Sequence, residues 1–186
     1  MTEGAWTDLL NSDWHDHLGS GRREDRLSDP DWRGRFFAAH ALDVAGIPDD
    51  RLIPALRALR ELMRRIADAY AAGGAPPRSD WEALNACFAR APLARRIAPP
   101  VRGARPRLGL APLAGRLDSL LGDIAQTFVA TLAEGDPARV KVCRNADCHW
   151  IFYDRSKNRT RKWCEATCGN LMKVRRFRER NRERRY

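Results

Sequence analysis

The feature that most constrains this chain of 186 residues is a group of four cysteines near its C-terminal end. The order is Cys143-x4-Cys148, then fifteen residues, and then Cys164-x3-Cys168. Two close pairs of thiols at such a separation are typical of a zinc site, because a tetrahedral ion takes two ligands from each of two chain turns. Four thiolates also fill the coordination shell, so the sequence predicts one structural zinc ion with no position open for catalysis.

The alternatives to zinc fit the rest of the sequence less well. Two disulfides need an oxidising compartment, but the first residues have neither the basic region nor the apolar run of a secretory signal, so we expect a cytoplasmic protein. Neither pair has the C-x-x-C spacing of a redox motif, and Cys87 is expected to be a small buried residue of a helix. No stretch approaches the ~20 apolar residues of a membrane span, so no membrane partner is expected.

The residues around the cysteines predict a small treble-clef-like zinc module from about residue 139 to residue 186. Residues 145–147 are turn formers and predict a knuckle around the first cysteine pair. Residues 149–153 are strand-like, and we predict that they form a hairpin with residues 161–163. Cys164 and Cys168 stand four apart, so they project from one side of the first turn of a basic helix.

The preceding part of the chain, residues 1–138, predicts a mainly helical domain, so the expected fold class is mainly α. Capping residues and apolar spacings of three and four mark the helices. The predicted helices cover residues 29–46, about 49–72, a shorter segment from Ser79, and residues 112–135. Residues 90–111 contain four prolines and no helical period, and there Ile97, Val101, Leu108 and Leu110 predict a short β-hairpin.

The net charge of +10 is concentrated in the same C-terminal quarter as the cysteines. Residues 143–186 hold 14 lysines and arginines against 5 acidic residues, whereas the first 142 residues hold 20 and 19. This asymmetry predicts a near-neutral body joined to an end that binds a polyanion. Arginine outnumbers lysine there by 11 to 3, and its planar guanidinium suits phosphate groups and guanine edges. We therefore expect a nucleic acid as the partner.

The expected nucleic-acid contacts lie between the cysteine pairs and along the C-terminal helix. The candidates are Arg155, Lys157, Arg159, Arg161, Lys162, Lys173, Arg175, Arg176, Arg178, Arg180 and Arg182. Leu171, Val174 and Phe177 share one stripe of the helix and are predicted to pack on the zinc core. Arginines surround the helix beyond Phe177, so we expect its last turns to order only on binding. The alternative is a solvated basic face that only aids solubility.

A second cluster of polar and aromatic residues lies near the N-terminus. Asn11, Asp13, Trp14 and His15 are candidates for a pocket that binds a small-molecule effector. The alternative, which we favour, is an irregular segment held on the helices by ion pairs and buried tryptophans. The sequence contains no G-x-S-x-G, phosphate-binding glycine loop or H-E-x-x-H motif, so we do not expect an enzyme. A small-molecule enzyme that uses this cluster is a weaker hypothesis.

Several of these motifs resemble a known pair of domains. The cysteine pairs, Trp150–Ser156, Arg161–Cys164 and Cys168-Gly169-Asn170 resemble the CGNR zinc finger. Asn11–His15 and Leu84-Asn85-Ala86 resemble the ABATE domain that usually precedes that finger. Leu171 stands where the family motif has an arginine, whose role is therefore missing or has moved, for example to Lys173.

The resemblance implies a bacterial transcription regulator in two parts. Residues 1–138 are expected to form an ABATE-like sensor domain, and residues 139–186 a CGNR-type finger with a basic helix. DNA is then favoured over RNA as the partner, with an RNA-binding factor as the alternative. Recognition of paired half-sites fits a homodimer, although the sequence shows no heptad seam.

Overall fold

The computed structural model describes residues 4–99 and 105–184 of the chain. Within these ranges the chain forms six α-helices and three antiparallel two-stranded hairpins, which confirms the mainly α fold class. In chain order the elements are α1 (Ala5–Leu10), β1 (Asp13–His15), β2 (Arg23–Asp25), α2 (Pro30–Ala39), α3 (Asp49–Ala71), α4 (Arg78–Arg90), β3 (Leu93–Ala98), β4 (Arg107–Pro112), α5 (Arg116–Glu134), β5 (Val140–Val142), β6 (Ile151–Tyr153) and α6 (Ala166–Glu183). Short 3₁₀ turns precede α2 and β5. None of the described helices is long and apolar enough to cross a membrane.

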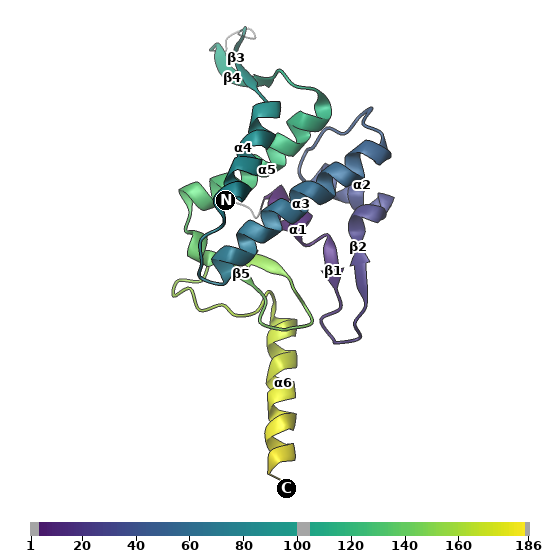
Figure 1. The fold of residues 1–186 in the computed structure, drawn as a ribbon, viewed down its shortest axis with the longest axis vertical. Coiled ribbons are helices and arrows are strands. Elements are labelled where there is room, and N and C mark those ends of the chain that lie inside the picture. The colour runs from purple at the N-terminus through teal and green to yellow at the C-terminus, as the bar shows by residue number, and fades with distance from the viewer. Residues whose placement is uncertain (1–3, 100–104, 185–186) are drawn as a thin grey trace.

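The core of the body forms around α3, the longest helix (Figure 1). Its apolar residues recur at helical spacing, and Leu56, Met63 and Ile66 are fully buried. The short helix α1 packs across α3 and α5 and adds Trp6, whose side chain is 1% exposed and whose Nε1 donates to Thr131 Oγ1 at 3.1 Å. Full burial of a large apolar side chain stabilises the fold by roughly 1.5–3 kcal/mol, so α1 contributes strongly despite its length.

The predicted helices are present, but two of their ends differ from the prediction. The helix predicted over residues 29–46 stops at Ala39, because Ala41 adopts a left-handed backbone with φ of 51°. Helix α5 begins at Arg116 and not near residue 112, because the preceding residues extend into β4. Neither α1 nor the β1–β2 hairpin was predicted, since elements this short show no clear period.

The hairpin predicted within residues 90–111 is confirmed as β3–β4. Ile97 pairs with Leu108, and Arg95 pairs with Leu110, while Val101 lies outside the described residues. The hairpin extends from the end of the molecule opposite α6 (Figure 1). Its aliphatic side chains are largely exposed.

The β5–β6 hairpin joins the zinc module to the body. Val140 and Ile151 are buried in the same core as α3 and α5. The strand predicted at 149–153 is present only over Ile151–Tyr153, because His149 adopts a left-handed backbone, and its partner is β5 and not residues 161–163. The knuckle with the first cysteine pair lies between the two strands. Residues 161–163 are held in a loop, where the Arg144 N–H donates to the Lys162 carbonyl at 3.0 Å.

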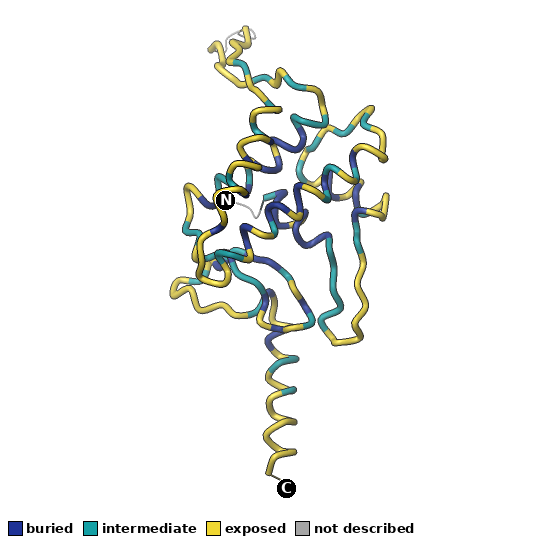
Figure 2. Tube along the Cα trace, viewed as in Figure 1, coloured by how far each residue is buried: buried dark blue, intermediate teal, exposed yellow. Residues whose placement is uncertain are grey.

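Helix α6 projects from the body along the long axis of the molecule (Figure 1). Exposed residues cover it beyond its first turns (Figure 2). The predicted packing of its apolar stripe on the zinc core is wrong, because Val174 is 45% exposed and Phe177 is 58% exposed. The helix continues to Glu183, contrary to the expectation of unordered last turns, since arginine and glutamate are good helix formers.

Candidate metal centre and nucleic-acid interface

The four cysteines of the C-terminal quarter converge on one buried point. Cys143 follows β5, Cys148 ends the knuckle, Cys164 precedes α6, and Cys168 lies in the first turn of α6. Their sulfur atoms lie within 4.8 Å of one another, and the Cys164 Sγ is 3.6 Å from the Sγ of both Cys148 and Cys168. Tetrahedral zinc with Zn–S bonds of about 2.3 Å places its sulfurs about 3.8 Å apart. The cysteines are therefore positioned to bind one zinc ion.

Three of the thiols, Cys143, Cys148 and Cys164, influence one another's ionisation because they lie close together. Hydrogen bonds from the Cys148 and Cys164 thiols lower the pKa of Cys143 to about 2. The same hydrogen bond with Cys143 raises the pKa of Cys148 to about 12, and the pKa of Cys164 is also raised. One thiolate, at Cys143, thus forms easily, and its presence opposes the ionisation of Cys148 and Cys164. The positive charge of zinc removes this opposition, because metal binding deprotonates the ligands.

Polar side chains fix the loops that carry the cysteines. The buried Asn145 amide donates to the His17 carbonyl at 2.8 Å and lies 3.7 Å from the Cys168 Sγ, so it connects the knuckle to the β1–β2 loop and to a zinc ligand. Asp154 is fully buried and binds Lys141. Burial opposes ionisation of this carboxyl, but the hydrogen bonds from Lys141 and Ser156 outweigh it and lower the pKa of Asp154. The charged pair holds the loop between the cysteine pairs.

Gly169 of the predicted motif has a packing role. It is buried in the first turn of α6, and a Cβ at this position would lie 3.0 Å from Cδ1 of Trp163. The absence of a side chain therefore allows the indole to pack directly on the helix. Arg176, two turns later, places its guanidinium carbon 6.0 Å from the centroid of the same ring. Leu171, at the position of the motif arginine, is half-buried, and Lys173 is exposed.

The structure divides the eleven basic candidates into engaged and free side chains. Arg175 forms an ion pair with Asp147 at 2.6 Å and donates to the Leu18 carbonyl at 2.8 Å. Gly19 makes room for it: a Cβ there would lie 2.9 Å from Arg175 Nη2, and φ is +92°. Arg159 pairs with Asp136 at 2.7 Å. These contacts were not predictable from local sequence.

The other candidates are exposed. Arg161 donates to the Trp163 carbonyl and lies over the Phe152 ring. Arg161 and eight further side chains have no ion-pair partner among the described residues; the eight are Arg155, Lys157, Lys162, Lys173, Arg176, Arg178, Arg180 and Arg182. Sequence reasoning also missed Lys141 and Arg144, which line a hollow of about 430 Å³ with Arg159, Arg161 and Lys162. Arg144 therefore extends the basic surface, whereas the ammonium group of Lys141 is already bound by Asp154.

The four residues of the predicted ligand pocket do not share one site. Asn11 is 4% exposed, and its amide exchanges two hydrogen bonds with the Ile151 backbone, at 2.9 and 2.8 Å. Trp14 is covered by two arginines, Arg22 and Arg26. Asp13 and His15 do line a common cavity of about 450 Å³.

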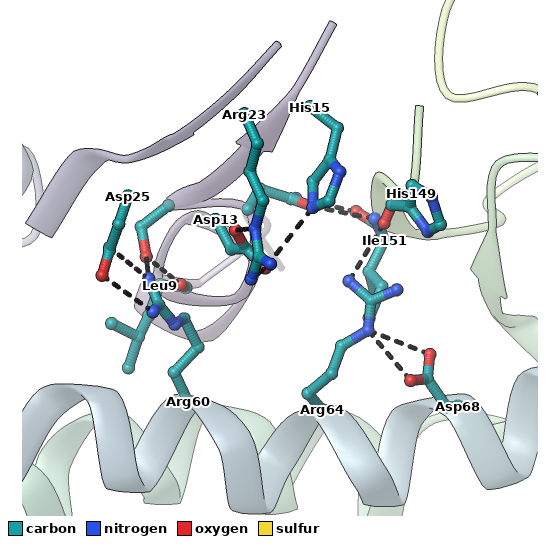
Figure 3. Close-up of polar contacts among 12 residues, drawn as sticks. Leu9, Asp13, His15, Arg23, Asp25, Arg60, Arg64, Asp68, His149 and Ile151 are labelled. Atoms are coloured by element: carbon teal, nitrogen blue, oxygen red, sulfur yellow. Dashed lines mark hydrogen bonds and ion pairs between the residues drawn. The ribbon is translucent and has the colours of Figure 1, made fainter. Parts of the chain in front are cut away.

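That cavity is built largely from residues that were not predicted. Arginines of β2 and α3 and His149 of the knuckle surround it (Figure 3). Burial, and then the neighbouring His15 and Arg64, lower the pKa of His149. Two of these arginines, Arg60 and Arg64, stand four residues apart on α3, and this spacing was the available sequence signal.

Comparison with protein families agrees with this architecture. The family model ABATE, described as “Putative stress-induced transcription regulator”, matches residues 3–135. The chain belongs to the ABATE family. The CGNR zinc finger matches residues 139–181 and contains all four cysteines. Comparison with curated proteins gives no significant match. The ABATE region thus contributes α1 to α5, and the CGNR finger contributes the zinc site, the β5–β6 hairpin and α6.

Proposed function

We propose that this chain is a DNA-binding transcription regulator whose CGNR finger presents α6 to the duplex. The observation that carries the proposal is the exposure of α6: the zinc site anchors its first turn, and the rest projects from the body with free basic side chains (Figures 1 and 2). A helix of this kind fits the major groove of B-DNA, which admits one α-helix. Arginine and lysine neutralise phosphates and release counterions, which supplies affinity.

One face of α6 has the composition expected for contact with bases. Lys173, Phe177 and Arg180 are spaced four and three apart, so they lie on one side of the helix. Arginine reads guanine edges, and an exposed apolar ring contacts the thymine methyl group. Arg176 lies on the same side of the helix, three residues after Lys173, with its guanidinium over Trp163. Arg178 and Arg182 point in other directions and are placed for the phosphates that fix the register of a protein on the duplex. The exposure of Phe177 is thus explained by a ligand rather than by a core.

A regulator without catalysis agrees with the composition of the metal centre. Four thiolates occupy every position of a tetrahedral zinc ion, so the metal is structural. Of the two matching families, one is described as a transcription regulator and the other as a zinc finger. We propose a cytoplasmic location as well, because the DNA that a bacterial transcription regulator binds lies there. We infer that the chain is not an enzyme.

RNA is the second candidate ligand, and the exposed aromatic ring of Phe177 favours it. Single-stranded RNA is read by bases that stack on aromatic side chains and arginine planes. The shape of α6 favours the duplex, because a single projecting helix offers no platform on which successive bases lie. The two ligands are separated by competition at equal salt.

The test is selection from a random duplex pool with the zinc-loaded full chain at roughly physiological ionic strength, where the Debye length is about 8 Å. We expect a defined motif, and an excess of single-stranded RNA should compete poorly. The variant R178Q/R180Q/R182Q should lose binding. The control R95Q/R96Q/R107Q removes the same charge from the exposed β3–β4 hairpin at the opposite end and should bind as the parent does. Recovery without a motif, or equal losses in both variants, would refute sequence-specific recognition by α6.

A further inference from the structure

We propose that the cavity between the ABATE region and the zinc knuckle binds a small carboxylate or phosphate anion, and that this anion regulates α6. We call it the junction cavity. The regulatory part of this inference rests on the proposed function, whereas the binding part does not. The residues that carry it are Arg23 of β2, Arg60, Arg64 and Arg65 of α3, His15 of β1 and His149 of the knuckle.

The position and size of the junction cavity suit a small ligand. Its volume is about 450 Å³, within the range of about 300–1,000 Å³ that is usual for ligand sites. Figure 3 shows side chains from the β1–β2 hairpin, from α3 and from the knuckle directed toward one space. The imidazole rings of His15 and His149 lie on one side of this space with centroids 4.5 Å apart. Segments far apart in the chain thus form its walls.

The charge of the lining favours an anion. Four arginines line the cavity against two acids, Asp13 and Glu61, so guanidinium donors predominate in its lining. Three of the arginines are paired with acids that do not line the cavity. Asp25 holds Arg60 at 2.7 Å, Asp68 holds Arg64 at 3.0 Å, and Asp80 holds Arg65 at 2.8 Å. These ion pairs restrict the orientation of the guanidiniums.

The fixed guanidiniums keep donors that no described residue uses. Arg64 donates through Nε and Nη1, Arg65 through Nε and Nη2, and Arg23 through Nε and Nη2. Within the described ranges, Arg64 Nη2, Arg65 Nη1 and Arg23 Nη1 donate to no protein atom. Guanidinium donors in a fixed arrangement match the oxygen atoms of carboxylate and phosphate groups.

The same elements connect the junction cavity to α6. Arg64 Nη1 donates to the His149 carbonyl at 3.0 Å, next to the zinc ligand Cys148. The β1–β2 hairpin supplies Asp13 and His15 to the cavity, and its loop accepts hydrogen bonds from Asn145 of the knuckle and from Arg175 of α6. An anion that draws the hairpin toward α3 therefore acts on the contacts that orient α6. A ligand that binds one orientation more tightly shifts the population toward it.

The binding test uses the zinc-loaded full chain without nucleic acid, with inorganic phosphate and succinate as probes at constant ionic strength. Imidazole NMR signals report on the site, and His40, which pairs with Asp8 on α1, serves as the internal reference. We expect saturable shifts of the His15 and His149 signals in the millimolar range with at least one probe, and none at His40. Absence of saturable shifts with both probes would overturn the inference.

Two variants separate this site from the basic helix. R23Q/R64Q should weaken binding at least about tenfold, because each charged hydrogen bond contributes strongly. R78Q/R96Q removes the same charge from exposed positions outside the cavity and should bind as the parent does. R178Q/R180Q/R182Q should also keep the shifts. Two results would place the anion elsewhere: loss of the shifts in R178Q/R180Q/R182Q, or undiminished binding in R23Q/R64Q. Zinc content of one ion per chain and an unchanged circular dichroism spectrum verify that each variant is folded.

Regulation is measured separately, so its failure is distinguishable from failure of the DNA-binding proposal. Duplex affinity is compared with and without a saturating probe at constant ionic strength. We expect a change of severalfold in the parent and none in R23Q/R64Q. An equal change in both proteins would mean that the probe competes at α6. Duplex binding that does not respond to a bound probe would refute the coupling alone.

Discussion

Replacement of Asn11 by alanine tests whether the zinc module and the body are held together as the structure indicates. The Asn11 amide donates to the Ile151 carbonyl at 2.9 Å and accepts from the Ile151 N–H at 2.8 Å. Both residues are nearly inaccessible, at 4% and 1% exposure. Alanine leaves two buried backbone groups without partners, and each costs roughly 1–3 kcal/mol. The expected loss in unfolding free energy is therefore about 2–6 kcal/mol, out of the roughly 5–15 kcal/mol typical of a native protein.

The assay is urea unfolding of the zinc-loaded chain with two probes. Circular dichroism follows the helices, and a chromophoric chelator follows zinc release. We expect both probes to shift to lower urea together in N11A, since Val140 and Ile151 share the core of the body. The control is N158A, an exposed loop residue that should change stability by less than about 0.5 kcal/mol. A loss in N11A no larger than in N158A, or a shift in only one probe, would refute the reasoning.

Three further predictions concern the metal, the basic helix and acid stability. C164S should lose zinc and unfold the module, because zinc contributes roughly 10–16 kcal/mol in small zinc modules; an unchanged metal content would contradict this. With about six phosphate contacts, the logarithm of the DNA-binding constant should fall with the logarithm of salt concentration at a slope near −5. R178Q should reduce the magnitude of this slope by about 0.9, whereas R175Q should not, since Arg175 is already in an ion pair. Equal reductions in both variants would argue against the assignment. Burial opposes ionisation of Asp25, but hydrogen bonds led by Arg60 lower its pKa, so its stabilisation is present above the unfolded pKa of about 3.9 and is lost as pH falls below it. The acid limb of the unfolding free energy should be flatter in D25N, and parallel profiles would exclude this role.

Local patterns were sufficient for the features that depend on neighbouring residues. The spacing of the cysteines predicted the zinc ligands because each pair lies on one turn. The period of α3 predicted its bounds to within one residue, since one face of the helix is buried along its whole length. The hairpin at residues 90–111 was also predicted, because prolines and turn residues excluded a helix.

Tertiary contacts determined what the sequence could not predict. Strand β6 pairs with β5, because burial of Val140 and Ile151 against distant helices stabilises that register. Asn11 was interpreted as a pocket residue, but its side-chain amide hydrogen-bonds the backbone of Ile151 in β6, 140 residues away. Arg175 resembled its basic neighbours in the sequence, and only the position of Asp147 distinguishes it.

The shared core has a consequence for how such proteins recombine. The two family models meet at the short segment between residues 135 and 139, where a genetic exchange would join one body to another finger. Yet the incoming finger would bring its own residues at the positions of Val140 and Ile151. In this chain those residues pack on the apolar surface of the body, and Ile151 is bound by the Asn11 amide. A finger from a relative with a different body would keep its cysteines but lose its support. Exchange of modules in this architecture therefore requires matched halves, and the two parts are expected to change together during evolution.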